Sequence, residues 1–304
     1  MKLNTTIKTL CAAVALAASA AATAGTFYLN NGIDYTGTVG VADQDQVCPT
    51  CTAIKSSFAF QYDSSSFIAD TDGSGTMSVG DIVNTQFGLA VPGSNTGTNR
   101  ITALLPEPSG FPVSDNSSNG YLTNWLMTFS GNLVGQVVGV NAGVPLVAYG
   151  FGSVIDMFIL SASTGYAPVN FMDIVLASGI PTGGSTELAG YADFTNVDLA
   201  ASASLKNLFN AEKGLVCSEG LTGFYDIWSK CGAESVTIDF LGSMNTALFA
   251  TDFVAVIVDD EITGYKVISN HSGTGTFDIP EPASLALLGA GLIGLGAIRR
   301  RKTA

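Results

Sequence analysis

The segment from Asp70 to Asp81 places oxygen-bearing side chains at alternate positions along a short, glycine-rich stretch. Calcium prefers carboxylate, hydroxyl and carbonyl oxygens and accepts many of them at loose angles. Gly75 stands where a twelve-position calcium loop turns sharply. The residues that would bind the ion are Asp70, Asp72, Ser74, Thr76, Ser78 and Asp81, with Thr76 acting through its backbone carbonyl. The spacing therefore predicts a calcium site, and we expect no other cofactor.

This loop resembles those of EF-hand and dockerin-like proteins, but it departs from them in two ways. The last ligand is Asp81 instead of Glu, which has a shorter reach for closing the site. Flanking residues such as Ile68 and Ile82 are typical of strands and not of paired helices. The alternative is a glycine-rich β-hairpin turn in which Asp and Ser side chains bind backbone groups. If calcium binds, we expect the weak affinity of extracellular modules.

Residues suited to hydrolysis are scarce. His271 is the single histidine, and its neighbours Asn270 and Gly273 indicate a loop or linker. A lone histidine excludes a multi-histidine metal site and disfavours a Ser-His-Asp triad. A glycosidase pair needs two carboxyl groups only about 5 to 9.5 Å apart, which sequence spacing does not reveal. The candidates are Asp173, Glu187, Asp193, Asp226, Asp259, Asp260 and Glu261. We expect a protein that is not an enzyme, with an exported hydrolase as the alternative.

Four of the five cysteines, Cys48, Cys51, Cys217 and Cys231, lie outside the N-terminal apolar segment. In an oxidising environment, four cysteines predict two disulfides, for which three pairings exist. We favour Cys48 with Cys51 and Cys217 with Cys231, because short loops cost less entropy to close. The second bond would close a loop of about 15 residues and stabilise the fold by roughly 3 kcal/mol.

Alternation of apolar and polar residues dominates the rest of the chain. It is clear in 57–62, and in large part in 125–140 and 235–241. Further strand candidates are 26–29, 101–105, 146–160, 171–176, 247–258 and 275–279, separated by clusters of Gly, Pro, Asn and Ser. This pattern predicts an all-β fold, a β-sandwich of jelly-roll-like type. One short helix is expected at 199–212, where Leu205, Leu208 and Phe209 have helical spacing, and a long surface loop at 106–120.

The N-terminal residues have the three parts of a secretory signal peptide. Lys2 and Lys8 precede the apolar run 10–20, and Ala22-Thr23-Ala24 offers the small-x-small pattern that signal peptidase accepts. Residues 1–24 are therefore expected to be a signal peptide, with the mature chain beginning at Gly25. Residues 25–277 would form one ectodomain, and 278–304 a separate C-terminal segment.

The C-terminal segment combines a short apolar stretch with a terminal cluster of cations. Pro280, Glu281 and Pro282 precede the uncharged residues 283–298, and Arg299, Arg300, Arg301 and Lys302 follow. As a helix the stretch would be about 24 Å long, a little short of a ~30 Å hydrocarbon core. The positive-inside rule would keep the cations in the cytoplasm and the body outside. Residue chemistry alone indicates a membrane anchor.

The order of these parts resembles the PEP-CTERM sorting signal. The resemblance implies export in a Gram-negative bacterium, transient anchoring in the inner membrane, and removal of the tail by an exosortase. Pro280, Glu281, Pro282, Arg299, Arg300 and Arg301 would then be residues that the processing machinery recognises. The protein would be sorted to the cell surface or the extracellular matrix.

The net charge of the chain between the two terminal segments limits the classes of partner that it can bind. Without residues 1–24 and 280–304, 6 Lys and Arg remain against 24 Asp and Glu, a net charge of −18. Such a surface repels nucleic acid and anionic lipid. Together with the resemblance, this favours a surface or matrix protein involved in cell aggregation, biofilm or exopolysaccharide association, as in flocculation-associated members of that group. A calcium-dependent carbohydrate-binding module remains a further alternative.

Overall fold

The computed structural model describes residues 25–35, 37–38, 46–106, 117–150, 152–162, 165–182, 185–197, 205–244 and 249–279. The predicted signal peptide and residues 280–304 of the predicted sorting tail lie outside these residues. The elements are β1 (Phe27–Leu29), β2 (Lys55–Ala69), β3 (Ile82–Gly88), β4 (Arg100–Pro106), β5 (Trp125–Asn141), β6 (Val144–Tyr149), β7 (Val154–Ser161), β8 (Val169–Thr182), β9 (Ser185–Asp193), β10 (Phe209–Ala211), α2 (Phe224–Cys231), β11 (Thr237–Met244), β12 (Val254–Val258) and β13 (Glu261–Asp278), with 3-10 turns at Val216–Ser218 and Ala250–Asp252. The all-β class predicted from the sequence is confirmed.

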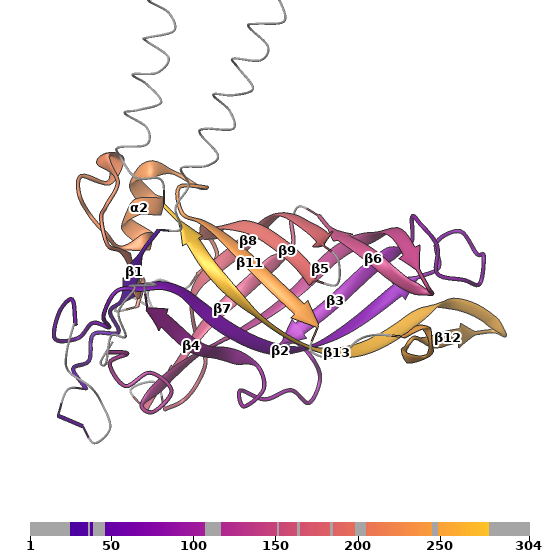
Figure 1. Ribbon diagram of the computed structural model, residues 1–304, viewed down its shortest axis with the longest axis horizontal. Helices are drawn as coiled ribbons and strands as arrows, with labels where there is room; N and C mark the ends of the chain where they lie inside the picture. Colours follow the sequence, from indigo (N-terminus) through magenta and orange to yellow (C-terminus); the bar gives the residue numbers. More distant parts are fainter. Residues whose placement is uncertain are drawn as a thin grey trace, which may run out of the picture.

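The strands form one antiparallel sheet that closes on itself (Figure 1). Following the pairings from β2 leads through β3, β5, β7, β8, β9, β11 and β13 and back to β2. This differs from the expected sandwich, in which two separate sheets would stack face to face. The long ladder between β2 and β13, about 200 residues apart in sequence, joins the two edges. A closed ring of eight strands leaves an interior that side chains fill or that holds one small ligand.

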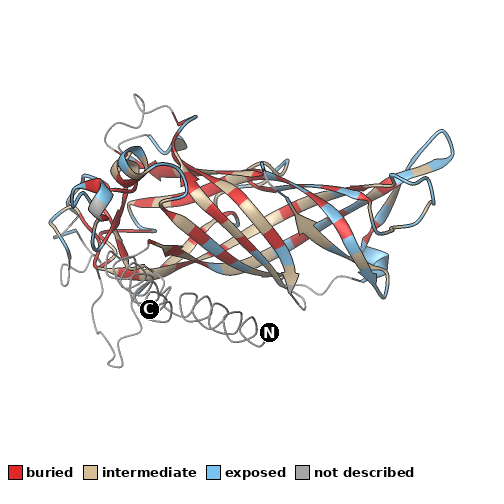
Figure 2. Cartoon of the chain, turned by 90° about the horizontal axis from the view of Figure 1, so that it is seen from above, coloured by how far each residue is buried: buried red, intermediate tan, exposed pale blue. Residues whose placement is uncertain are grey.

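Alternation places every second residue of each strand inside the ring. Along β2 the inward positions are Phe58, Phe60, Tyr62, Ser64, Ser66 and Ile68. Buried residues accordingly alternate with less buried ones along the strands of the elongated body (Figure 2). Gly273 and Gly275 on β13 make room for the rings of Phe60 and Phe58, since an added Cβ would lie 2.5 and 2.3 Å from them.

One end of the body is filled with aromatic rings. Phe277 is fully buried there, with ring centroids 4.8 to 5.8 Å from those of Phe27, Phe58, Phe209 and Phe224. The helix α2 and the strand β1 lie at this end, and the β12–β13 hairpin lies at the other (Figure 1).

The helix predicted at 199–212 is wrong over its described part. Residues 205–208 form turns, and Phe209–Ala211 forms β10, which pairs with β1. The apolar spacing that suggested a helical face instead sends Leu208 and Phe209 into the aromatic core. The short helix of the structure is α2, in which Phe224 and Ile227 are buried. None of the described helices has the length and apolarity needed to cross a membrane.

Candidate functional site

The Asp70–Asp81 loop connects β2 to β3, so strands flank it on both sides. Asp81 is buried at the base of the loop, where its carboxylate accepts hydrogen bonds from the backbone N–H of Thr71 (3.0 Å) and of Ser78 (2.8 Å). Asp70 accepts from the backbone N–H of Gly75 at 2.7 Å. Gly75 has a φ of 67°, the conformation that the predicted sharp turn requires.

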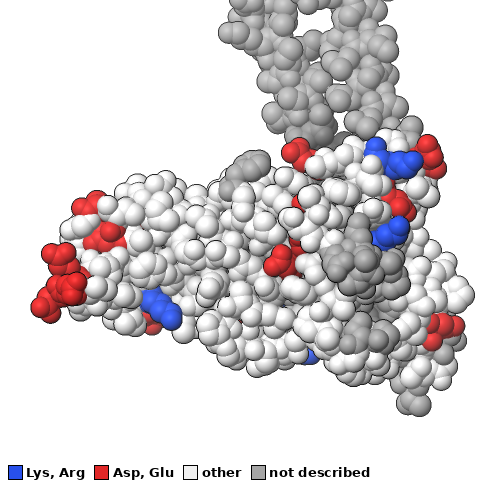
Figure 3. Space-filling model, turned by 180° about the vertical axis from the view of Figure 1, so that it is seen from behind, with Lys and Arg blue, Asp and Glu red and all other residues white. Residues whose placement is uncertain are grey.

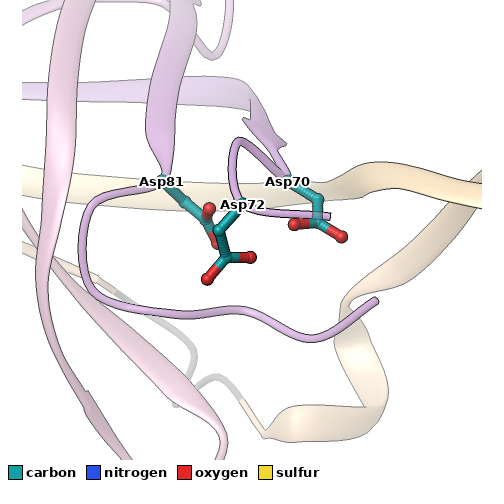
Figure 4. A group of neighbouring side chains, drawn as sticks. All are labelled: Asp70, Asp72 and Asp81. Atoms are coloured by element: carbon teal, nitrogen blue, oxygen red, sulfur yellow. The ribbon is translucent and has the colours of Figure 1, made fainter. Parts of the chain in front are cut away.

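Three carboxylates converge within this loop (Figure 4). Oxygens of Asp70, Asp72 and Asp81 all lie within 4.8 Å of one another. Hydrogen bonds from Ser74 and then Ser78 hold the pKa of Asp72 below its usual range. The cluster could therefore bind a metal ion. The alternative, a glycine-rich turn, also fits this geometry. In such a turn, Asp side chains accept hydrogen bonds from backbone groups of the loop, as Asp70 and Asp81 do here.

The predicted hydroxyl and carbonyl ligands are engaged with neighbours in the loop. The Ser74 hydroxyl donates to the carbonyl oxygen of Thr76 at 2.9 Å, and the Ser78 hydroxyl donates to Asp72 at 3.0 Å. The structure thus brings all six predicted residues into one loop, with the three aspartates at its centre.

A cavity of about 770 Å³ occupies the other half of the ring, beyond the aromatic core. Its wall is mostly apolar, with contributions from Phe87, Leu133, Met157 and Leu188. A second apolar cluster, which includes Ile68 and Val267, lies at the end nearest the Asp70–Asp81 loop.

A group of polar side chains projects into this apolar space. The imidazole Nε2 of His271 lies 2.8 Å from the Ser64 hydroxyl and 2.9 Å from the Ser269 hydroxyl, and the two hydroxyls are 2.9 Å apart. The ring of Tyr62 stacks on the imidazole with centroids 4.6 Å apart. Burial lowers the pKa of His271 to about 4, although Asp63 raises it slightly. The imidazole is therefore neutral at pH 7.

The interpretation of His271 as a loop or linker residue is wrong. His271 lies within β13, paired with Tyr62 of β2 and Met244 of β11, and lines the cavity. Its neighbour Gly273 is also a strand residue, and its small size makes room inside the closed sheet for the ring of Phe60. Sequence reasoning also missed Ser64 and Ser269. The signal available was the change from aromatic to hydroxyl side chains at alternate positions of β2.

Two of the candidate glycosidase acids are brought together by the sheet. Asp173 pairs in register with Asp193 on β9 and with Asp156 on β7. Burial raises the pKa of Asp173 to about 6, a hydrogen bond from Asn170 lowers it, and the carboxylates of Asp156 and Asp193 raise it further. The row occupies strand positions that alternate with inward residues such as Ile174, so it lies outside the cavity.

Both local disulfides are present in the structure, Cys48 with Cys51 and Cys217 with Cys231. The second links α2 to the 3-10 turn at Val216–Ser218, next to the aromatic core. Tyr121 and Trp125 are also buried in the core, with ring centroids 4.7 Å apart.

Fold and sites together define an antiparallel, disulfide-bonded β protein whose closed sheet encloses a cavity. Residues 278–302 match the family model of the PEP-CTERM protein-sorting motif. The chain thus carries this motif at its C-terminus, as the resemblance of Pro280, Glu281 and Pro282 indicated. The motif implies an exported protein that exosortase sorts to the cell surface. No curated protein and no solved structure is significantly similar to the chain.

Proposed function

We propose that this is a non-catalytic surface or extracellular-matrix protein that helps cells bind one another or their exopolysaccharide. The observation that carries the proposal is the sorting motif at 278–302, because a tail for exosortase destines the body for the exterior. Signal peptidase and exosortase would be its processing partners. The tail would anchor it in the inner membrane until processing.

The charge of the surface supports a role among polymers and cations outside the cell. Acidic side chains gather at the end of the body that carries the β12–β13 hairpin, where Asp259, Asp260 and Glu261 are exposed, and basic side chains are few (Figure 3). Such a surface repels nucleic acid and attracts divalent cations. Divalent cations can in turn bridge acidic proteins to acidic polysaccharide.

The geometry of the hydroxyl–imidazole cluster supports a role other than catalysis. Ser64 lies mid-strand, paired with Phe87 on one side and Ser269 on the other, so the sheet engages the backbone around it. An oxyanion hole needs free N–H donors beside the nucleophile. A base with a pKa near 4 also accepts a proton poorly at neutral pH.

Deletion and complementation in the host test the proposal. We expect the deletion strain to lose aggregation or matrix retention, the full chain to restore it, and a chain ending at Asp278 to be exported without restoring it. In the exosortase-positive host, intact mass should show a mature form that begins near Gly25 and ends near Pro280. Unchanged aggregation in the deletion strain would contradict the proposed role.

We further propose that the Asp70–Asp81 loop binds a cation and that this cation is calcium. Three carboxylate oxygens within 4.8 Å of one another repel, a cation between them would offset that repulsion, and calcium suits an oxygen-rich loop. Extracellular-grade sites bind with dissociation constants of roughly 0.1 to 1 mM. Adding 10 mM calcium, about 10 to 100 times such a constant, would then stabilise the fold by roughly 1.4 to 2.7 kcal/mol.

Thermal unfolding with calcium, magnesium and EDTA tests this site. Calcium should raise the Tm of the wild type but not of Asp72→Asn, whereas Asp260→Asn, on the exposed β12–β13 turn, should respond like the wild type. An equal Tm in calcium and in EDTA would leave the glycine-rich turn as the explanation of the loop. If calcium binds, retention on exopolysaccharide with and without it distinguishes a calcium-dependent carbohydrate-binding module from a simple structural site.

A further inference from the structure

The inward positions of β2 change character halfway along the ring. Phe58 and Phe60 fill the interior at the α2 end, whereas Ser64 and Ser66 leave it open beyond Tyr62. Protein interiors are packed so closely that voids larger than a water molecule are few. A cavity of about 770 Å³ is far larger, and its size falls within the range of small-molecule sites.

The wall of the ring opens beside this cavity. β7 pairs with β8 along six residue pairs, but β6, which continues the wall, pairs with β8 only at Tyr149 and Gly179. Leu146 of β6 and Phe249 line the cavity and are also 41 and 65% exposed. The cavity therefore reaches the surface between β6 and the segment that begins at Phe249. Among the described residues, this is where a small molecule would enter the interior.

The polar side chains that line the cavity are hydroxyls, the neutral imidazole and the amide of Asn141, none of which is charged. Besides the cluster at His271, the Ser66 hydroxyl lies 2.8 Å from that of Thr85, which lies 3.1 Å from the Tyr149 hydroxyl. No Lys or Arg is found among the described residues that line the cavity. Burying a carboxylate or phosphate here would leave its charge unpaired, which is costly. Hydroxyls and imidazole, in contrast, hydrogen-bond readily to a neutral head group.

We propose that the cavity binds one neutral amphiphile, a molecule with a long apolar body and a single hydroxyl or carbonyl group. The apolar body lies against Phe87, Leu133 and Leu188, and the head group hydrogen-bonds to the hydroxyls of Ser64 and Ser269. A neutral lipid alcohol or ketone has this chemistry. The inference does not depend on a role in aggregation, because it concerns only the interior of the folded body.

The test uses the processed protein recovered from the host and the neutral fluorophore N-phenyl-1-naphthylamine. We expect saturable fluorescence enhancement with one site per chain. 1-Dodecanol should displace the probe at a concentration at least about tenfold lower than dodecanoate at pH 7, because only the carboxylate carries an unpaired charge into the cavity. Absence of saturable binding would overturn the site. Equal displacement by the alcohol and the carboxylate would overturn the neutral head group.

Paired variants locate the head group. In Ser64→Ala/Ser269→Ala, affinity for dodecanol should fall about tenfold, since two hydrogen bonds are lost, while affinity for the fluorophore is retained. Retained fluorophore binding also shows that the variant is folded. Ser65→Ala, one residue along β2 and facing outward, is the matched control and should bind dodecanol like the wild type. If Ser65→Ala lowers the affinity for dodecanol as much as the double variant does, the assigned contacts are wrong. Cell aggregation is measured separately, so failure of either proposal leaves the other intact.

Discussion

The two ends of the closed sheet are built from the same long strands but have opposite interiors. At the α2 end, β2 and β13 turn Phe58 and Phe277 inward, and the rings fill the space. At the hairpin end, the same strands turn Ser64 and Ser269 inward, and a cavity remains. The backbone pairing is continuous between the two ends. Residue choice at fixed positions, and not strand geometry, therefore decides which half is solid.

The ends also differ in how they are secured. The packed end carries β1, β10, α2 and the disulfide Cys217–Cys231. The hollow end carries the Asp70–Asp81 loop and the acidic β12–β13 hairpin. We expect the packed end to carry most of the stability and the hollow end to carry the binding chemistry.

The largest expected effect is on the free energy of unfolding, when a buried aromatic ring is truncated at one end or the other. Phe277→Ala removes a fully buried ring with four aromatic neighbours and should lower the free energy of unfolding by about 3 to 5 kcal/mol. Phe87→Ala, on the cavity wall, should cost about 2 kcal/mol, because its ring already borders empty space and loses fewer contacts. Urea unfolding of both variants measures the difference. Equal losses would show that the two halves are equally well packed.

The next effect concerns the disulfides. Replacing Cys217 and Cys231 by Ser should cost about 3 kcal/mol, since the bond closes a loop of about 15 residues in the unfolded chain. Replacing Cys48 and Cys51, which close a much shorter loop, should cost about 2 kcal/mol on the same model. Chemical unfolding under oxidising conditions compares the two double variants. A larger loss for the Cys48–Cys51 variant would contradict this order.

A third prediction follows from the buried imidazole of the hollow end. Burial lowers the pKa of His271 from 6.5 to about 4, so the folded state disfavours the proton. Its contribution to stability is therefore fully present above pH 6.5 and is lost as pH falls from 6.5 towards 4. We expect a loss of about 2 kcal/mol over this window, which His271→Gln should remove. Because the chain has a single histidine, NMR can follow its titration directly. A pKa near 6.5 would contradict its burial.

The smallest expected effect is the pH dependence of stability that Asp173 causes, and its sign is opposite to that of His271. Burial raises the pKa of Asp173 from 3.8 to about 6, so the folded state favours the proton, and stability declines as pH rises from 4 to 6. Asp173→Asn should stabilise the protein by about 1 kcal/mol at pH 8, since it removes a buried charge and can still accept the hydrogen bond from Asn170. Unfolding at pH 4 and pH 8 measures this. The same gain at both pH values would exclude a charge effect.

Much of the secondary structure could be predicted from local sequence patterns. Alternation in 57–62 and 125–140 predicted β2 and β5, because the side-chain period of a strand is visible in sequence. The strand predicted at 146–160 is two strands, since β6 ends at Tyr149 and β7 begins at Val154. β9 was not predicted, although its residues alternate, and its position depends on pairing with β8 and β11. The helix at 199–212 failed for a related reason, since apolar spacing does not reveal that β1 offers a strand edge to β10.

The sequence by itself determined the features that depend on local chemistry. These are the sorting motif, the strand periodicity, the two short-range disulfides and the clustering of Asp70, Asp72 and Asp81 in one loop. Only the tertiary structure decided the closure of the sheet, because β2 and β13 meet across nearly the whole chain. Closure in turn placed Ser64, Ser269 and His271 around one point inside. Side chains so distant in sequence leave no common pattern along the chain, and their chemistry arises only when the ring is formed.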